Sequence, residues 1–278
     1  MLAVFVIVIL FATCAGATCG MGGGVIIKPV LDALSPMSAF QINFVSSMCV
    51  LAMALSSLVK HLFQKKSSHI PTAVAAACGA FAGGVAGEFI FEAVENAAGS
   101  VLGENADALI KIIQNSVLAL LLVGVLVYML LRKEKGVYLP SAAMTIKAFA
   151  ACCVLGVIST FLGIGGGPIN VCVLCLVLRT DTKEVTFYSL LTVMFAQVAK
   201  LFKLAVTGGF TSNVILDVNL EWWALVIMIA AAVIGGLLGA VLNKRLSSKA
   251  VNRIYYAVIG IVIALNIYNI IYNAVTAL

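Results

Sequence analysis

Two glycine clusters carry the most distinctive chemistry of this chain. Residues 20–24 read GMGGG, residues 163–167 read GIGGG, and both clusters interrupt strongly apolar sequence. Glycine lowers helix stability by about 1 kcal/mol per residue relative to alanine, so both clusters are expected to break a helix. The amides freed at a break, together with the positive end of the helix that follows, form a binding site for an anion. The backbone candidates for this site are Gly22, Gly23, Gly24, Gly165, Gly166 and Gly167.

A nucleotide-binding loop is the other chemistry that a glycine cluster can serve. That interpretation requires a preceding β-strand and a βαβ unit, and the apolar sequence around the clusters favours neither. Pro29 and Pro168 instead suit broken or starting helical segments, because the first turn of a helix needs no amide donor from proline.

Lys28 lies four positions after the first cluster. An ammonium at the centre of a membrane helix costs about 2.5–3.5 kcal/mol if it is unpaired, so Lys28 needs a counter-charge or a route to the surface. Two interpretations stay open: Lys28 contributes charge to an anion site, or its side chain snorkels to the external interface. Its counterpart after the second cluster is Val171, so either role belongs to one half of the chain.

Polar side chains near the clusters are candidates to line the same site. Each has an alternative role in holding membrane helices together, as serine and threonine often do. The candidates are Asn43, Asn170, Ser189 and Gln197, with Gln41, Ser46, Ser47, Thr186 and Thr192 as further polar neighbours.

Charged residues also follow these polar positions. Lys200 and Lys203 lie beyond Gln197 and are expected to snorkel to the outer membrane surface. Glu88, Glu92 and Glu95 share one helical face, which suits either a proton relay or the solvated external end of a helix. The solvated end is the favoured interpretation.

The composition sets the environment of these residues. Hydrophobic residues make up 63% of the 278 residues and charged residues 10%, with a mean hydropathy of +1.16, whereas soluble domains carry about 25% charged residues. The chain is therefore expected to be an all-α polytopic membrane protein, since helices satisfy the backbone in lipid. Seven apolar runs are long enough to span a bilayer: 39–59, 73–93, 109–131, 143–161, 185–206, 222–242 and 254–271.

Other residue types give few signals. The apolar N-terminal stretch lacks the basic region of a secretory signal and is kept as part of the fold. The eight cysteines are expected to be buried free thiols, and the two histidines form no metal cluster. We expect no cofactor and no nucleic-acid partner. The lipid bilayer is the expected surrounding of the chain.

Basic and acidic residues separate along the chain. Lys and Arg gather near residues 60–66, 132–135, 179–183 and 244–253, whereas the connections 88–107 and 207–221 are acidic. By the positive-inside rule the basic connections are cytoplasmic and the acidic ones external. This predicts that residues 61–69 and 244–253 are cytoplasmic and that both termini are external, in a plasma or inner membrane.

When the chain is followed through these cytoplasmic and external connections, the three helices of the first half cross the membrane in the opposite direction to those of the second half. Segments 1–34 and 143–178 must each return to the side they enter from, so each is expected to be a broken hairpin that turns at its glycine cluster. We therefore predict two inverted-topology repeats, 1–136 and 137–278, each a hairpin followed by three transmembrane helices. Inverted repeats with broken helices are typical of secondary transporters.

Repeated motifs agree with this division. The glycine clusters match at an offset of 143 residues, as do Ser46 with Ser189 and Lys60 with Lys203. The GG-x-x-G motifs at 83–87 and 235–239 match at an offset of 152 and are interpreted as helix-packing devices.

The first glycine cluster continues to Pro29 and Leu31 in a pattern that resembles the GxGGGxxxxPxL signature of the sulfite exporter TauE/SafE family, also called the 4-toluene sulfonate uptake permease family. The resemblance spans the chain in order: glycine break, polar helix, GG-x-x-G helix and final helix, then the same again. It implies an inner-membrane permease for sulfur-containing or other small organic anions, without a cofactor.

Two positions depart from the family pattern. Residues 39–43 read AFQIN where the family often has A-x-G-T-[SN], and Cys172 stands where repeat symmetry with Pro29 would place proline. The resemblance therefore supports the location of the binding site better than it supports the identity of the substrate.

The sequence therefore predicts a secondary transporter of a small anion such as sulfite, thiosulfate or an organosulfonate, with a proton or sodium ion as the possible coupling partner. The alternative is an anion channel, or a carrier for a carboxylate. An intramembrane enzyme is not expected, because no nucleophile–base pair is found within the helices. Oligomeric state is left open.

Overall fold

The computed structural model describes residues 2–35, 37–62, 69–102, 106–131, 142–206 and 222–276, and every regular element within them is an α-helix. This confirms the all-α prediction, and each of the seven predicted apolar runs lies within one helix. In chain order the helices are α1 (Leu2–Cys19), α2 (Gly24–Leu34), α3 (Ala39–Leu62), α4 (Ile70–Leu102), α5 (Ala106–Leu131), α6 (Ala142–Phe161), α7 (Gly167–Leu178), α8 (Thr182–Val206), α9 (Trp222–Arg245) and α10 (Ser248–Thr276).

Eight of the described helices are long and apolar enough to cross a membrane, which makes this a multi-pass membrane protein. The other two, α2 and α7, have only 11 and 12 residues, whereas a crossing needs about 20. Helix α4 has 33 residues. It continues well beyond residue 93, where the apolar run had predicted its end.

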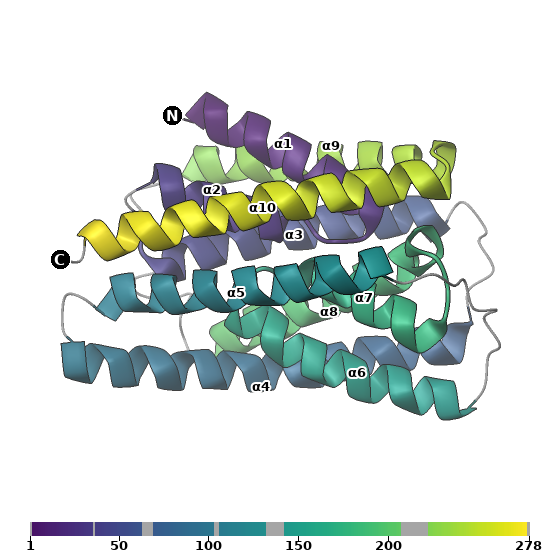
Figure 1. Ribbon diagram of the computed structural model, residues 1–278, viewed down its shortest axis with the longest axis horizontal. Helices are drawn as coiled ribbons and strands as arrows, with labels where there is room; N and C mark the ends of the chain where they lie inside the picture. The colour runs from purple at the N-terminus through teal and green to yellow at the C-terminus, as the bar shows by residue number, and fades with distance from the viewer. Residues whose placement is uncertain are drawn as a thin grey trace.

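Each short helix follows a glycine turn. Gly22 has a φ of 70° and Gly166 a φ of 111°, in the region that glycine alone adopts readily. The Met21 amide donates to the Gly16 carbonyl at 2.9 Å, and the Ile164 amide donates to the Ser159 carbonyl at 3.2 Å. The predicted helix breaks are therefore present: glycine turns separate α1 from α2 and α6 from α7 (Figure 1).

The long arm of each hairpin packs along a helix from the other half of the chain. Helix α6 lies along α4, and α1 lies along α9. A Cβ atom added at Gly87 would lie 2.6 Å from the Val157 carbonyl oxygen, and one added at Gly235 would lie 2.7 Å from that of Leu10. Because the backbones approach this closely, the packing role predicted for the GG-x-x-G motifs is confirmed.

The helices lie roughly along one direction (Figure 1). Both chain termini lie at one end of the bundle, together with the last turn of α4 and the first turn of α5. Helices α3 and α9, whose last turns carry basic residues, end at the opposite end. Helix α2 lies toward the end with the termini, and α7 toward the other end.

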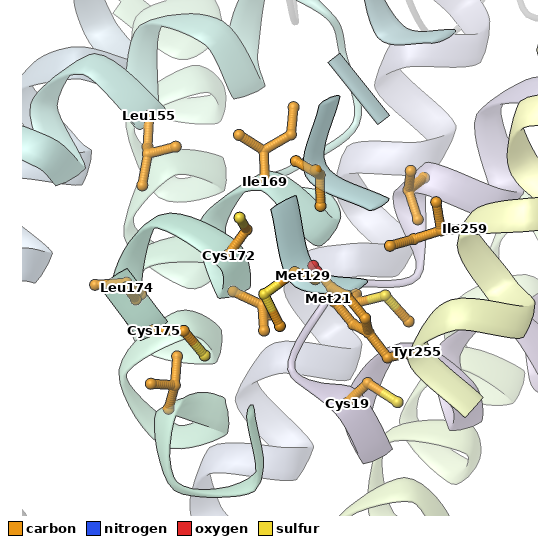
Figure 2. Close-up of a cluster of buried hydrophobic side chains, with 14 of the residues drawn as sticks. Cys19, Met21, Met129, Leu155, Ile169, Cys172, Leu174, Cys175, Tyr255 and Ile259 are labelled. Atoms are coloured by element: carbon orange, nitrogen blue, oxygen red, sulfur yellow. The ribbon is translucent and has the colours of Figure 1, made fainter. Parts of the chain in front are cut away.

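The two halves of the chain share one hydrophobic core. Figure 2 shows Met21 of the first break clustered with Cys172 of α7 and Tyr255 of α10. The Tyr255 hydroxyl donates to the Pro168 carbonyl at 2.8 Å, which ties the end of the second break to α10. All eight cysteines are free; five are buried, but Cys78 is exposed on α4, contrary to the prediction of burial.

Candidate functional site

The two glycine breaks touch each other inside the bundle. A Cβ atom added at Gly22 would lie 3.2 Å from the Gly165 carbonyl oxygen, and one added at Gly24 would overlap the carbonyl group of Ile164. Every residue in 20–24 and 163–167 is buried. The structure thus brings together the six glycines that the sequence selected for the site.

Both short helices begin at this junction. Helix α2 begins at Gly24 and α7 at Gly167, with Pro168 in the first turn of α7, and no side chain caps either start by a hydrogen bond. The first amides of a helix lack acceptors within the helix and carry about half of an elementary positive charge. Two such helix ends in one buried region are electrostatically suited to an anion.

Asn43 of α3 and Gln197 of α8 flank the junction. A Cβ atom added at Gly163 would overlap the Asn43 amide, and one added at Gly165 would overlap that of Gln197. The Oδ1 and Nδ2 atoms of Asn43 and the Oε1 atom of Gln197 are buried without a hydrogen-bond partner among the described residues. An unsatisfied buried polar group costs about 1–3 kcal/mol, so a ligand at the junction would satisfy these atoms. The Nδ2 group of Asn43 is the donor among them, and the two oxygens can only accept hydrogen bonds.

Asn170 and Ser189, also predicted for the site, already have protein partners. Asn170 donates to the Thr192 hydroxyl at 3.3 Å and accepts from the Ser159 hydroxyl at 3.4 Å. Ser189 donates to the Gly20 carbonyl at 2.6 Å, which anchors the first break to α8. Both residues border the junction, and their hydrogen bonds hold its shape.

Lys28 of α2 is buried against the C-terminal end of α6. It is 3% exposed, so its side chain does not snorkel to the external interface as one interpretation held. Its Nζ atom donates to the Leu162 carbonyl at 2.5 Å and to Gln114 Oε1 at 2.6 Å, and Gln114 donates in turn to the Phe161 carbonyl at 2.6 Å. The ammonium thereby compensates the negative C-terminal end of α6 at the break.

Two charged residues were placed wrongly by sequence reasoning. Lys200 is only 6% exposed, and Glu88 only 4%, so neither lies at a solvated helix end. The expectation for Glu88 failed because α4 extends to Leu102, which leaves the residue in the interior of the helix. Lys203 is also buried, although it bonds the partly exposed carboxylate of Glu92.

A pocket of about 540 Å³ opens beside the end of α2. Asp32 and Lys111 line it with their charged atoms 3.6 Å apart, and Asn115 donates to Asp32 at 2.8 Å. Asp32 lies one helical turn from Lys28, so polar side chains extend from this pocket toward the glycine junction. The sequence analysis did not single out these residues, because their pairing joins α2 to α5 across about 80 positions of the chain.

Comparison with known protein families identifies the family of this chain. The model of the family described as "Sulfite exporter TauE/SafE" matches residues 5–267. The chain belongs to the sulfite exporter TauE/SafE family. No curated protein and no solved structure gave a significant match.

Membership in the TauE/SafE family indicates that nearly the whole bundle belongs to a membrane transporter. The matched residues include both glycine breaks and nearly all of the ten described helices. The two observations agree: TauE/SafE is a family of membrane transporters, and the buried helix starts of this chain lie inside a multi-span bundle.

Proposed function

We propose that this protein is a secondary transporter of a small sulfur-containing anion, such as sulfite, thiosulfate or an organosulfonate. The observation that carries the proposal is the buried junction, where two uncapped helix starts meet beside the unsatisfied amides of Asn43 and Gln197. The partial positive charges of the helix starts and the free Nδ2 donor of Asn43 together suit an anion that has shed its water.

The transport cycle is proposed to rest on two inverted repeats, 1–136 and 137–278. The packing of the helices supports this arrangement, because α6 lies on α4 as α1 lies on α9, and α8 packs on α4 as α3 packs on α9. In such folds one repeat rocks against the other around a fixed central site. The contact between the two glycine breaks would lie at that pivot.

The basic ends of α3 and α9 are proposed to face the cytoplasm, and both termini the outside of an inner or plasma membrane. The pocket beside Asp32 and Lys111 then opens outward. It would form the external vestibule, from which an anion approaches the junction past α2.

The proposal is tested by the thermal unfolding of purified protein with a panel of sodium salts at equal ionic strength. We expect sulfite, thiosulfate or methanesulfonate to raise the Tm, because a ligand at 100 times its Kd adds about 2.7 kcal/mol of stability. Dimethyl sulfone, which is neutral, should have no effect. If acetate alone raises the Tm, the substrate is a carboxylate, and if no salt exceeds chloride the anion site is wrong.

Uptake into proteoliposomes then separates a carrier from a channel. A carrier gives an initial rate that saturates with anion concentration, and its rate responds to an imposed ion gradient. A rate that rises linearly to high concentration would contradict the transporter proposal and favour a channel.

A further inference from the structure

A buried charged pair lies between α4 and α8, outside the glycine junction. The Nζ atom of Lys200 and the Oε2 atom of Glu88 are both buried without a hydrogen-bond partner among the described residues. A Cβ atom added at Gly84, one helical turn before Glu88, would lie 2.9 Å from the Cβ atom of Ala199, which precedes Lys200, so the two charged residues face each other across the contact between α4 and α8. Among the described residues, no ion pair within 4.0 Å joins them. An ammonium and a carboxylate are thus held close together and apart from water, each with hydrogen-bonding capacity that the protein leaves unused.

Other charged residues lie on these two helices and on helices packed against them. Glu92 of α4 bonds Lys203 of α8 one turn further along, and Glu95 of α4 also interacts electrostatically with Lys200. Helices α6 and α7 pack on α8 as well, and their one charged residue is Lys147, 13 positions before Thr160. Lys111 of α5 is engaged by Asp32 and the Met37 carbonyl.

The pair adjoins the glycine junction from both of its helices. Lys200 follows Gln197 by three residues on α8, and Gln197 contacts Gly165. Glu88 follows Gly87 on α4, and a Cβ atom added at Gly87 would lie 3.1 Å from Thr160 Cβ, in the last turn of α6 before the second break. Lys200 therefore lies about one helical turn along α8 from Gln197, and Glu88 adjoins the residue of α4 that packs on the end of α6.

The fold does not require these charges. At the repeat offset of 143, Lys200 corresponds to Ser57, and at the offset of 152, Glu88 corresponds to Ala240. Both counterparts are buried in the equivalent contact, between α3 and α9. One half of the molecule makes this contact with small residues, so the charges in the other half have a purpose beyond packing.

We propose that Glu88 and Lys200 are the proton-coupling site of the transporter, an inference that rests on the proposed function. Without substrate, the Glu88 carboxylate balances the Lys200 ammonium. A proton from the aqueous phase binds Glu88, and a monovalent anion then takes over as the counter-charge of Lys200. The site carries no net charge before or after, so one proton and one monovalent anion cross together, and both leave on the other side as the carboxylate reforms.

The test uses methanesulfonate, whose charge is constant between pH 5.5 and 8. Wild-type protein in liposomes should acidify the lumen as it takes up labelled methanesulfonate, at one proton per anion and independently of membrane potential. Its affinity should fall by up to about tenfold per pH unit in the alkaline range, since one proton is bound with each anion.

Variants assign the two roles. Glu88→Gln should bind methanesulfonate with an affinity that no longer depends on pH, and should move it without protons. Lys200→Gln should lose at least about tenfold in affinity, and Lys200→Arg should retain most of it. Glu92→Gln is the matched control, because it removes the same charge one turn away on the same helix, and it should leave proton coupling unchanged.

Three outcomes are separable. Wild-type uptake without proton movement, or pH-dependent affinity that persists in Glu88→Gln, overturns the coupling site while the transporter proposal stands. Binding of no anion by wild-type protein overturns both. If a variant does not fold, wild-type uptake without proton movement still overturns the coupling site.

Discussion

At the scale of single residues, the polar side chains around the junction fall into two classes, those with hydrogen-bond partners in the protein and those without. Ser189 and Asn170 form hydrogen bonds with other residues of the protein. Asn43 and Gln197, in contrast, have buried polar atoms without a hydrogen-bond partner among the described residues. The two classes should respond differently to substitution, because only the first contributes to stability in the absence of a ligand.

We expect Asn43→Leu and Gln197→Met to keep the ligand-free Tm or to raise it, since each removes an unsatisfied polar group at similar volume. Asn43→Leu should also lower the affinity for the transported anion by about tenfold or more, because it removes the free Nδ2 donor and hydrogen bonds to charged groups contribute about 1.5–3 kcal/mol. Thermal unfolding with and without the anion measures both effects.

Ser189→Ala is the matched control for that pair. It removes the hydrogen bond to the Gly20 carbonyl, so the ligand-free protein should lose about 1 kcal/mol of stability. If Asn43→Leu and Gln197→Met lower the ligand-free Tm as Ser189→Ala does and leave affinity unchanged, these amides are structural and the site is misplaced.

At the scale of helices, the contact between α4 and α6 depends on the absence of side chains at its crossing points. A Cβ atom at Gly87 or Gly156 would lie 2.6 Å from a backbone carbonyl oxygen of the other helix. In lipid, such close packing replaces the hydrophobic effect as a source of helix association. The same arrangement holds α1 against α9 through Gly235 and Gly239.

Gly87→Val is therefore expected to separate α4 from α6 and to reduce the yield of folded protein strongly. Gly124→Val makes the same change in α5, where an added Cβ would meet nothing within 4 Å, and should be nearly neutral. Size-exclusion chromatography of detergent extracts measures the folded fraction. Equal yields for the two variants would show that the close contact is not needed.

The sequence predicted helices and breaks well but not the depth of charged residues. Apolar runs and glycine clusters are local signals, and they located α3 to α6, α8 to α10 and both turns. The burial of Glu88 was missed because the end of an apolar run was taken as the end of α4. The partners of Lys28 were missed because Gln114 and Leu162 lie 86 and 134 positions away, and a single sequence carries no signal for such contacts.

At the scale of the whole molecule, the positions of the helix ends make the proposed membrane orientation testable. In a cysteine-free background, Ser100→Cys near the end of α4 should react with a membrane-impermeant maleimide in intact cells. Lys249→Cys at the start of α10 should react only after the cells are opened. Both positions are exposed, and labelling of position 249 from outside would reverse the orientation.

The pairing of α1 with α9 also constrains how the protein is made. The two helices are joined by hydrogen bonds from Thr18 to the Gly239 carbonyl and from Asn243 to the Thr18 carbonyl, across more than 220 positions of the chain. At a synthesis rate of about 5–20 residues per second, α1 leaves the ribosome about 10–40 s before α9 exists. During that interval the first hairpin lacks the surface that completes it, so nascent chains stopped before residue 222 expose an unfinished interface to membrane quality-control proteases.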